Sequence, residues 1–352
     1  YNANSPTSGV YSWVTTTGRF TGTFSANGQT WTAPATGGPY ALGLFRENAG
    51  DLLAGEPGGN INRDGDTTDV FGVLQDRVTK RVYVDLDQDR DFTDETSMID
   101  FKVNRDVGHF GTDDPATAVV DRVAFVVVTD RSIYNPDLDA GSVVNLGIAA
   151  AQHGTHVAGI AAGNGLFGGA MSGAAPGAQV IAVKVCLTTT SCTSSGLIDG
   201  VLYAAHNGAD VVNISIGGLP ALNDGNNARA ELYNRTIDEF NMQIFNSAGN
   251  SGAGANTVGD PAVATKSMAV GSSITDDTWL SNYGSEAAQT DGLHPFSSRG
   301  PREDGGFKPQ IIAPGAAVSS TPLWQNGGPV AGTYGLPPGY SMLNGTSMAA
   351  PQ

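Results

Sequence analysis

"DVVNISIGG", at residues 210–218, is a short apolar segment rich in β-branched residues, a composition typical of a buried β-strand. It is preceded by "SSGLIDGVLYAAHNGA" at 194–209, a segment that begins at serine and ends near Gly208, as helices commonly do. Before that helix comes "AQVIAVKVC" at 178–186, a second apolar run with the composition of a buried strand. Two strands joined through a helix predict a parallel pair, because parallel strands need a long crossover connection.

The same alternation continues toward the C-terminus. It predicts a helix at 227–241 and further strands at 242–250, 266–274 and 309–315. Such a pattern is typical of an α/β fold whose mostly parallel sheet is covered by helices on both faces. In these sheets functional residues collect where the strands end at their carboxyl edge. We therefore expect one α/β domain over residues 146–352, with its functional site at that edge.

The first 145 residues mix β-like alternation with acidic turns. Asn27-Gly28 lies between two alternating segments and is a strong signal for a β-hairpin. "RVYVDLDQDRDF" (81–92) and "RVAFVVVTD" (122–130) are expected to be strands that end in acidic loops. Residues 1–145 are therefore predicted to form a β-rich, acidic accessory region.

Composition and charge exclude several functional classes. The chain has 352 residues, 40% of them hydrophobic, which is ample for a large buried core. Its formal net charge of −16 argues against a nucleic-acid partner, because phosphates require a cationic surface. No segment approaches the roughly 18 apolar residues that span a bilayer, and no signal peptide is visible at the start. We expect a soluble protein without a membrane span.

Two histidines open a predicted helix in "QHGTHVAGIAAG" (152–163). His153 would lie near the helix N-terminus and His156 one turn further in. The pair could be two structural histidines, a zinc site, or could include a catalytic base. The usual helical zinc pair is spaced four residues apart with an intervening Glu, and this segment has neither feature.

An asparagine and a serine complete the set of candidate catalytic residues. Asn250 lies in the glycine-rich loop of "FNSAGNSGAGAN" (245–256), either as a turn residue or as an amide donor toward developing negative charge. Ser347 in "NGTSMAAP" (344–351) stands at a predicted helix start. It is either a helix cap or a nucleophile whose oxyanion the free N–H groups and the helix dipole would favour.

Six stretches, in this order and separation, resemble the subtilisin-like serine proteases (subtilases, peptidase family S8): "HGTHVAG", "VVNISIGG", "SAGN", "FSSRGP", "KPQIIAPG" and "GTSMAAP". The resemblance covers roughly residues 150–352 and implies a subtilisin-like three-layer α/β fold. It also implies a secreted serine endopeptidase that hydrolyses protein or peptide substrates through a Ser-His-Asp triad and an acyl-enzyme. No cofactor would be required for that chemistry.

The resemblance assigns roles to single residues. Ser347 would attack the peptide carbonyl, His153 would take and return its proton, and Asn250 would stabilise the oxyanion together with the Ser347 N–H. A cis peptide bond is expected before Pro261. The residues expected to bind the substrate backbone and to wall the first specificity pocket are Ser215, Ile216, Gly217, Ser247, Ala248 and Gly249.

The carboxylate that should orient His153 is not identified by the sequence. In the family it ends an early apolar strand and is followed by Thr or Ser and then Gly, and no such stretch exists here. Three candidates remain open: an Asp upstream of Tyr1, Asp130, and Asp85. Residues 1–145 resemble the long insertion that subtilases of the tripeptidyl-peptidase II type carry between the catalytic Asp and His.

After Ser347 the sequence continues only to Gln352, whereas the family continues a long buried helix. We therefore expect a fragment truncated at both ends, which is at best weakly proteolytic by itself. Two alternatives to an endopeptidase remain for the complete protein. One is a processing exopeptidase of the same family, and the other is a catalytically inactive scaffold or adhesion module.

Two acidic loops could bind structural calcium or could be solvated turns. The second loop starts at Asp85 like an EF-hand loop, but Arg90 stands at its sixth position and Thr96 at its twelfth, where Gly and Glu are usual. The carboxylates concerned are Asp64 and Asp66 in the first loop and Asp85, Asp87 and Asp89, the principal candidates, in the second.

The two cysteines of the chain, Cys186 and Cys192, are close enough in sequence to close a small disulfide loop. A bridge would fit an oxidising compartment, and the family resemblance would place it at a rim beside the substrate cleft. Two free thiols are the alternative.

Overall fold

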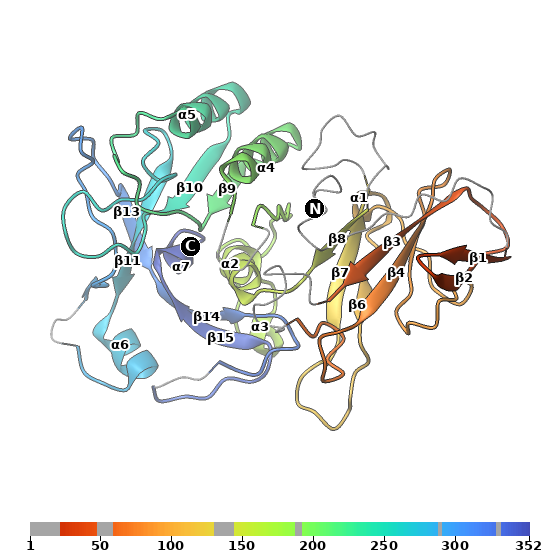
Figure 1. Cartoon of the computed structure of the whole chain (residues 1–352). Helices are drawn as coiled ribbons and strands as arrows, with labels where there is room; N and C mark the ends of the chain where they lie inside the picture. The colour runs from red at the N-terminus through yellow and green to blue at the C-terminus, as the bar shows by residue number, and fades with distance from the viewer. Residues whose placement is uncertain (1–21, 48–58, 130–143, 187–191, 288–290, 329–331) are drawn as a thin grey trace. The chain divides into compact units, whose positions relative to one another are not determined.

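The computed structural model describes residues 22–47, 59–129, 144–186, 192–287, 291–328 and 332–352 (Figure 1). Within it the chain forms two compact units. The first comprises Tyr1–Ala151 with Cys186–Ser191, and the second comprises Gln152–Val185 with Cys192–Gln352. Each unit is described by itself.

The first unit is built from small antiparallel sheets. Strands β1 (Gly22–Ala26) and β2 (Gln29–Ala33) form a hairpin. Asn27 and Gly28 at its turn both have positive φ, 52° and 72°, as a two-residue hairpin turn of this type requires. The hairpin predicted from Asn27-Gly28 is confirmed.

Two three-stranded sheets complete this unit. One has the order β3-β4-β5 and the other the order β6-β7-β8, with every pairing antiparallel. Their buried aromatic rings meet in the unit's interior, where Phe110 lies 4.9 Å from Phe71 and 4.5 Å from Phe125 between ring centroids. The elements are β3 (Tyr40–Arg46), β4 (Val70–Asp76), β5 (Val82–Val84), the short helix α1 (Phe101–Asn104), β6 (Gly108–Phe110), β7 (Val123–Val128) and β8 (Asn145–Ile148).

The second unit contains the parallel sheet that the sequence predicts. Its parallel strands lie in the order β9-β10-β11-β13, and the short β12 (Gly292–Leu293) pairs antiparallel with β11. The α/β class with a mostly parallel sheet is thus confirmed. The parallel strands are β9 (Val211–Ile214), β10 (Gln243–Ser247), β11 (Met268–Ile274) and β13 (Ile311–Pro314).

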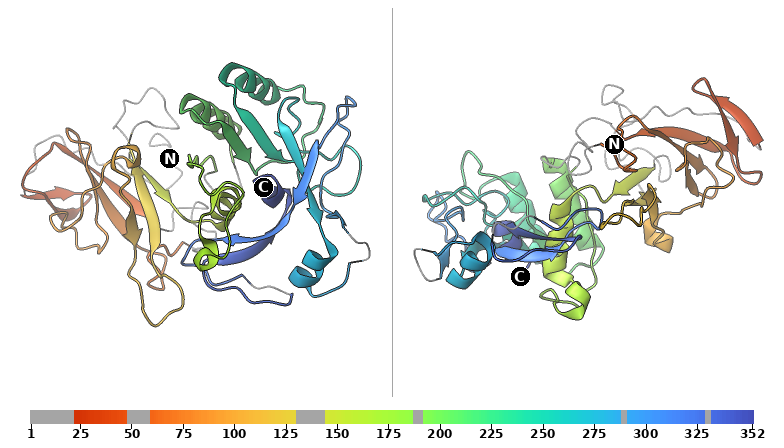
Figure 2. Two further views of the ribbon diagram at one scale, coloured as in Figure 1. Left: turned by 180° about the vertical axis from the view of Figure 1, so that it is seen from behind. Right: turned by 90° about the horizontal axis from the view of Figure 1, so that it is seen from below.

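Helices cover both faces of this sheet (Figures 1 and 2). Ile244 of β10 packs with α4 (Ser194–His206) and α5 (Ala228–Phe240), whose N-caps are the side chains of Thr193 and Asn227. The next residue, Phe245, packs on the other face against α7 (Thr346–Ala349). Because neighbouring residues of a strand point to opposite faces, the second unit has three layers, as predicted.

Further elements bring the N-terminal part of this unit to α7. Helix α2 (Gln152–Ala162) contacts α7 and β14 (Ala316–Ser320), and β14 pairs antiparallel with β15 (Tyr340–Asn344), the strand just before α7. The short α3 (Leu166–Gly169) follows α2, and α6 (Asp276–Tyr283) follows β11. None of the helices that the structure describes is long and apolar enough to cross a membrane.

The strand predicted at 178–186 is wrong. Residues 178–185 form neither helix nor strand, and Val180 and Ile181 are exposed. A β-branched run becomes a strand only where a neighbouring backbone satisfies its hydrogen bonds. Among the residues that the structure describes, β9 pairs only with β10, and no strand forms a ladder with this run.

Candidate active site

Ser347 lies in the first turn of α7, at the carboxyl edge of the parallel sheet. The residues on either side of it, Thr346 and Met348, are buried, and Ala349 and Ala350 pack this helix against Val270 of the sheet. Gly345, just before the helix, donates its N–H to Gly315 O over 2.8 Å. The Ser347 N–H makes no hydrogen bond to any residue that the structure describes, so it is free to donate to a developing oxyanion.

Ser215, which follows β9, holds Ser347 through two hydrogen bonds, one in each direction. The Ser347 hydroxyl donates to Ser215 O over 3.1 Å, and the Ser215 hydroxyl donates to Ser347 O over 2.7 Å. Asn213 donates its Nδ2 to Ser215 Oγ over 3.0 Å. The Ser347 hydroxyl proton is therefore directed at a backbone carbonyl.

Thr346 orients the side chain of Asn250. Both the N–H and the hydroxyl of Thr346 donate to Asn250 Oδ1, over 3.0 and 2.9 Å. A backbone N–H can only donate, so the oxygen of the amide must face Thr346 and Nδ2 must face away from it. Nδ2 makes no hydrogen bond within the described part of the chain, which leaves both of its protons available to a ligand.

The hydroxyl of Thr346 also accepts a hydrogen bond. It accepts the N–H of Gly249 over 3.1 Å, so one buried hydroxyl connects the loop after β10 to the start of α7. Sequence reasoning missed both Thr346 and the side-chain role of Ser215. The available signal was their position beside predicted site residues, in "GTSMAAP" and "VVNISIGG".

His153 lies in the first turn of α2, the helix that contacts α7. It is exposed and forms no hydrogen bond with any described residue, Ser347 included. Desolvation by the surrounding protein lowers the pKa of His153 below its ordinary value. The imidazole is therefore neutral near pH 7, the state that a general base requires.

His156 has a structural position. It is fully buried, and its Nε2 lies 3.0 Å from Ser341 O, so this nitrogen donates and ties α2 to β15. Burial lowers the pKa of His156 to about 4. Within the described residues, neither histidine of this helix belongs to a group of three or more potential metal ligands, which gives the zinc interpretation no support.

The predicted substrate-binding residues fall into two groups. Ile216 and Gly217 lie partly exposed between Ser215 and Gly218, which pairs in both directions with Asp260, at 3.1 and 2.9 Å. The peptide bond before Pro261 is cis, as expected.

The second group, Ser247–Gly249, has its backbone already engaged. Ala248 bonds to Val270 O and to Gly259 N, and Gly249 O accepts from Ser298 N. These residues can therefore wall a pocket, but Ala248 and Gly249 offer few free groups for pairing with a peptide.

The carboxylate that would orient His153 stays a prediction. Asp130 lies outside the described residues. Asp85 lies in the acidic loop of the first unit, where one carboxylate oxygen each of Asp85, Asp87 and Asp89 come within 4.8 Å of one another. This placement favours a role in that cluster for Asp85.

A second acidic cluster in the first unit joins Glu47, Asp66 and Asp69. The buried Glu47 carboxylate accepts the N–H groups of Ile61 and Asp69, both over 3.1 Å. Asp64, a candidate ligand from the sequence, is not part of this cluster. Cys186 and Cys192 are joined in a disulfide, which decides between the two alternatives that the sequence left open.

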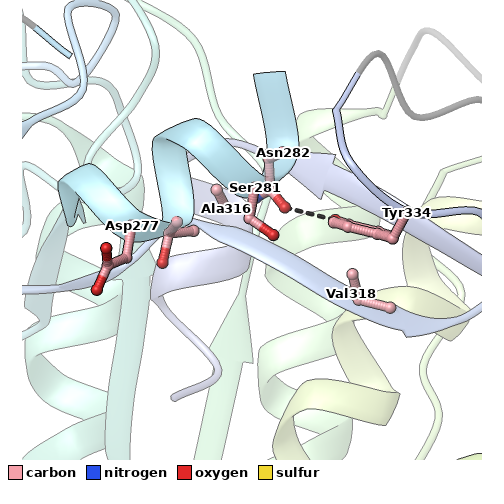
Figure 3. Close-up of a pocket in the computed structure, with 7 residues that line it drawn as sticks. Asp277, Ser281, Asn282, Ala316, Val318 and Tyr334 are labelled. Carbon is pink, nitrogen blue, oxygen red and sulfur yellow. Dashed lines mark hydrogen bonds between the residues drawn. The ribbon is translucent and has the colours of Figure 1, made fainter. Parts of the chain in front are cut away.

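A pocket of about 390 Å³ lies between α6, β14 and the segment that contains Tyr334 (Figure 3). The Tyr334 hydroxyl donates to Asn282 Oδ1 across it. Asp277 supplies a carboxylate at its exposed rim. None of the predicted catalytic residues lines this pocket, so it is separate from the Ser347 site.

Comparison with known proteins extends this picture. The chain is 30% identical to pyrolysin from Pyrococcus furiosus in an alignment that covers 89% of this chain and 23% of that protein. It is also 30% identical to tripeptidyl-peptidase 2 from Arabidopsis thaliana, over 76% of this chain and 18% of the relative. The chain thus spans about a fifth of the length of these relatives.

The crystal structure of tripeptidyl peptidase 2 (TPP II) superposes on 84% of this chain and 20% of that chain with a TM-score of 0.57 at 21% identity, which shows a shared fold. Residues 129–352 match the subtilase family. That match includes the nucleophile candidate on α7, the amide that Thr346 orients and the histidine on α2. With well over half of its residues matched, this chain belongs to the subtilase family of serine peptidases.

Proposed function

We propose that the protein is a serine endopeptidase that cleaves peptide bonds through an acyl-enzyme. The observation that carries the proposal is the arrangement at the start of α7. Ser347 stands there with a free N–H, beside an Asn250 amide whose Nδ2 Thr346 directs away from itself. A nucleophile and two preorganised donors at one helix start fit acyl transfer.

In the proposed reaction the Ser347 hydroxyl leaves Ser215 O, and its proton passes to the neutral imidazole of His153 as Oγ bonds to the substrate carbonyl carbon. The oxyanion receives the Asn250 Nδ2–H and the Ser347 N–H. His153 then gives the proton to the leaving amine as the peptide C–N bond breaks, and water repeats the sequence to release the acid. One oxyanion donor is worth about 10²–10³ in turnover, a value measured in a member of this same family.

The bond-breaking steps use only groups of the protein and water, so the proposal requires no cofactor for the chemistry. A carboxylate that orients His153 is part of the proposal, because its absence costs about 10⁴ in turnover. Asp130→Asn tests the nearest candidate in the sequence. A fall of that size in kcat would assign the role to Asp130, whereas unchanged turnover would exclude it.

The nucleophile is tested with a fluorophosphonate probe. We expect the probe to label Ser347 alone, and Ser347→Ala to abolish labelling. Ser251→Ala, in the loop beside Asn250, serves as the matched control and should label as the parent protein does. Labelling that survives Ser347→Ala would remove Ser347 from the mechanism.

A processing exopeptidase is the second candidate, because one relative is named tripeptidyl-peptidase 2. Digestion of an unstructured protein separates the two. An endopeptidase produces internal cuts and is insensitive to acetylation of the substrate N-terminus, whereas a tripeptidyl peptidase releases tripeptides and is blocked by it. Absence of all hydrolysis and of all probe labelling would leave the inactive scaffold.

We propose that the protein works outside the cell on protein or peptide substrates. The Cys186–Cys192 disulfide supports this location, since such bridges persist in oxidising compartments. We also propose that calcium has a structural role in the acidic loops of the first unit, supported by the two carboxylate clusters.

A further inference from the structure

The loop that follows β5 carries an oxygen atom without a partner in the protein. Asp85 is 1% exposed, and its Oδ2 has no hydrogen-bond partner among the described residues, while its Oδ1 accepts the N–H of Arg90 at 3.4 Å. A buried carboxylate oxygen is costly unless a donor or a cation compensates it. A cation bound beside this oxygen would supply the missing partner.

Three carboxylates converge at this position. Asp87 and Asp89 are exposed, and one oxygen of each lies within 4.8 Å of an Asp85 oxygen. Gln88 and Arg90 both have positive φ, 65° and 69°, so the chain curls and returns alternate side chains to the same side. No Lys or Arg of the described residues forms an ion pair with these three carboxylates.

Glu95 adds a fourth negative charge that the sequence pattern did not reveal. Its carboxylate accepts the N–H of Leu86 over 2.5 Å and so lies beside the start of the loop. The charges repel one another in the absence of a cation.

The ligand chemistry selects calcium. All the donors are carboxylate oxygens, which hard cations prefer and zinc does not. Ca²⁺ accepts irregular coordination by six to eight oxygens, which side chains on a curled loop and water can supply together. Mg²⁺ demands a near-ideal octahedron and keeps its water.

The loop is fastened to the core of the first unit at several points. Asp85 N bonds to Gly72 O on β4, while Arg90 O and Phe92 N bond to the backbone of Thr32 on β2, each over 2.9 Å. The fully buried ring of Phe92 stacks on Trp31 at a centroid distance of 5.7 Å. Ordering this loop therefore also orders the packing between the hairpin and the β3-β4-β5 sheet.

We propose that Asp85, Asp87 and Asp89 form a calcium site, with the charge of Glu95 beside it, and that the bound ion secures Phe92 in the core of the first unit. The proposal rests on the structural calcium proposed above and names its ligands. It also names what the ion stabilises, which is the contact of the loop with β2 and β4.

The test is calorimetric titration of calcium chloride into the metal-free full chain, with thermal melting of the same samples. Asp85→Asn removes the buried charge of the cluster, and Asp87→Asn removes one of its exposed charges. Because calcium affinity follows the number of ligand charges, we expect each to weaken binding at this site by about tenfold or more. Each should also abolish most of the calcium-dependent rise in melting temperature.

Two controls make the outcomes distinct. Asp94→Asn removes the same charge from an exposed neighbour and should change affinity less than about threefold. Asp66→Asn perturbs only the other acidic cluster. If the parent chain binds no calcium, the structural calcium itself is refuted. If it binds calcium but only Asp66→Asn weakens binding, the ligand set named here is overturned and the ion belongs to the other cluster.

Discussion

Replacing Thr346 by valine should lower kcat although Ser347 itself is unchanged. The substitution keeps the shape of a fully buried side chain and removes its hydroxyl. Asn250 Oδ1 then loses the 2.9 Å bond from the hydroxyl and keeps the 3.0 Å bond from the Thr346 N–H. Gly249 N–H loses its acceptor at 3.1 Å.

The magnitude follows from these contacts. Complete loss of an oxyanion donor costs about 2.7–4 kcal/mol in the transition state. Because Asn250 retains one of its two anchors, we expect about half of that cost, a fall in kcat of roughly 10- to 30-fold. KM should change by less than about twofold, because the donor acts on charge that develops only in the transition state. The unpaired Gly249 N–H should lower stability by about 1–3 kcal/mol.

Turnover of an internally quenched peptide and the rate of fluorophosphonate labelling measure the effect. Thr346→Ser keeps the hydroxyl and should stay near the parent rate. A double-mutant cycle with Asn250→Leu is decisive, since a residue that acts through Asn250 has no further effect once Asn250 is gone. If Thr346→Val slows the Asn250→Leu protein by the same factor as it slows the parent, the positioning role is refuted.

Three further predictions concern stability. Burial and, to a lesser extent, the charge of Arg302 lower the pKa of Lys308 to about 7. Between pH 7 and about 10.4 the unfolded chain therefore binds more protons than the native one. The free energy of unfolding should rise with pH over this range. Urea unfolding at several pH values should show Lys308→Met flattening that rise by up to about 1.4 kcal/mol per pH unit, while the exposed Lys266→Met should not. Phe110→Ala should cost about 3–5 kcal/mol by urea unfolding, since its fully buried ring contacts three other rings, whereas a cost below about 1 kcal/mol would contradict this packing. Gly159→Ala brings a Cβ into a clash with Ser319 Oγ and should push α2 away from β14, which should lower the free energy of unfolding by about 1–3 kcal/mol in the same assay. Gly177→Ala is the control, because its Cβ meets nothing within 4 Å.

The sequence predicts the elements that local chemistry determines. Apolar β-branched runs and capped helices predict β9, β10, β11 and the layers around them, because the pattern that buries a strand or a helix face lies within a few residues. The run at 178–186 shows the limit of this logic. Its composition is that of a strand, but a strand exists only when a second backbone accepts its hydrogen bonds, and composition does not supply one.

The same distinction between local pattern and distant contact applies to the residues of the candidate site. Ser347, Asn250 and His153 stand in short stretches whose residue types suggest chemistry, so the sequence alone proposes them as candidates. Thr346 and Glu95 do not stand out, because each acts through a side chain that meets another segment.

The hydrogen bonds that position Ser347 and Asn250 also join three distant segments of the second unit. The Thr346 hydroxyl meets a residue 96 positions earlier in the sequence, and the two bonds between Ser215 and Ser347 span 132 positions. Through them β9, the loop after β10 and the start of α7 converge. A substitution that loosens any of these contacts must therefore change both stability and the position of Ser347. Measurements on variants at this point should show the two effects together, whereas Phe110→Ala should change stability while leaving the Ser347, Ser215 and Thr346 contacts intact.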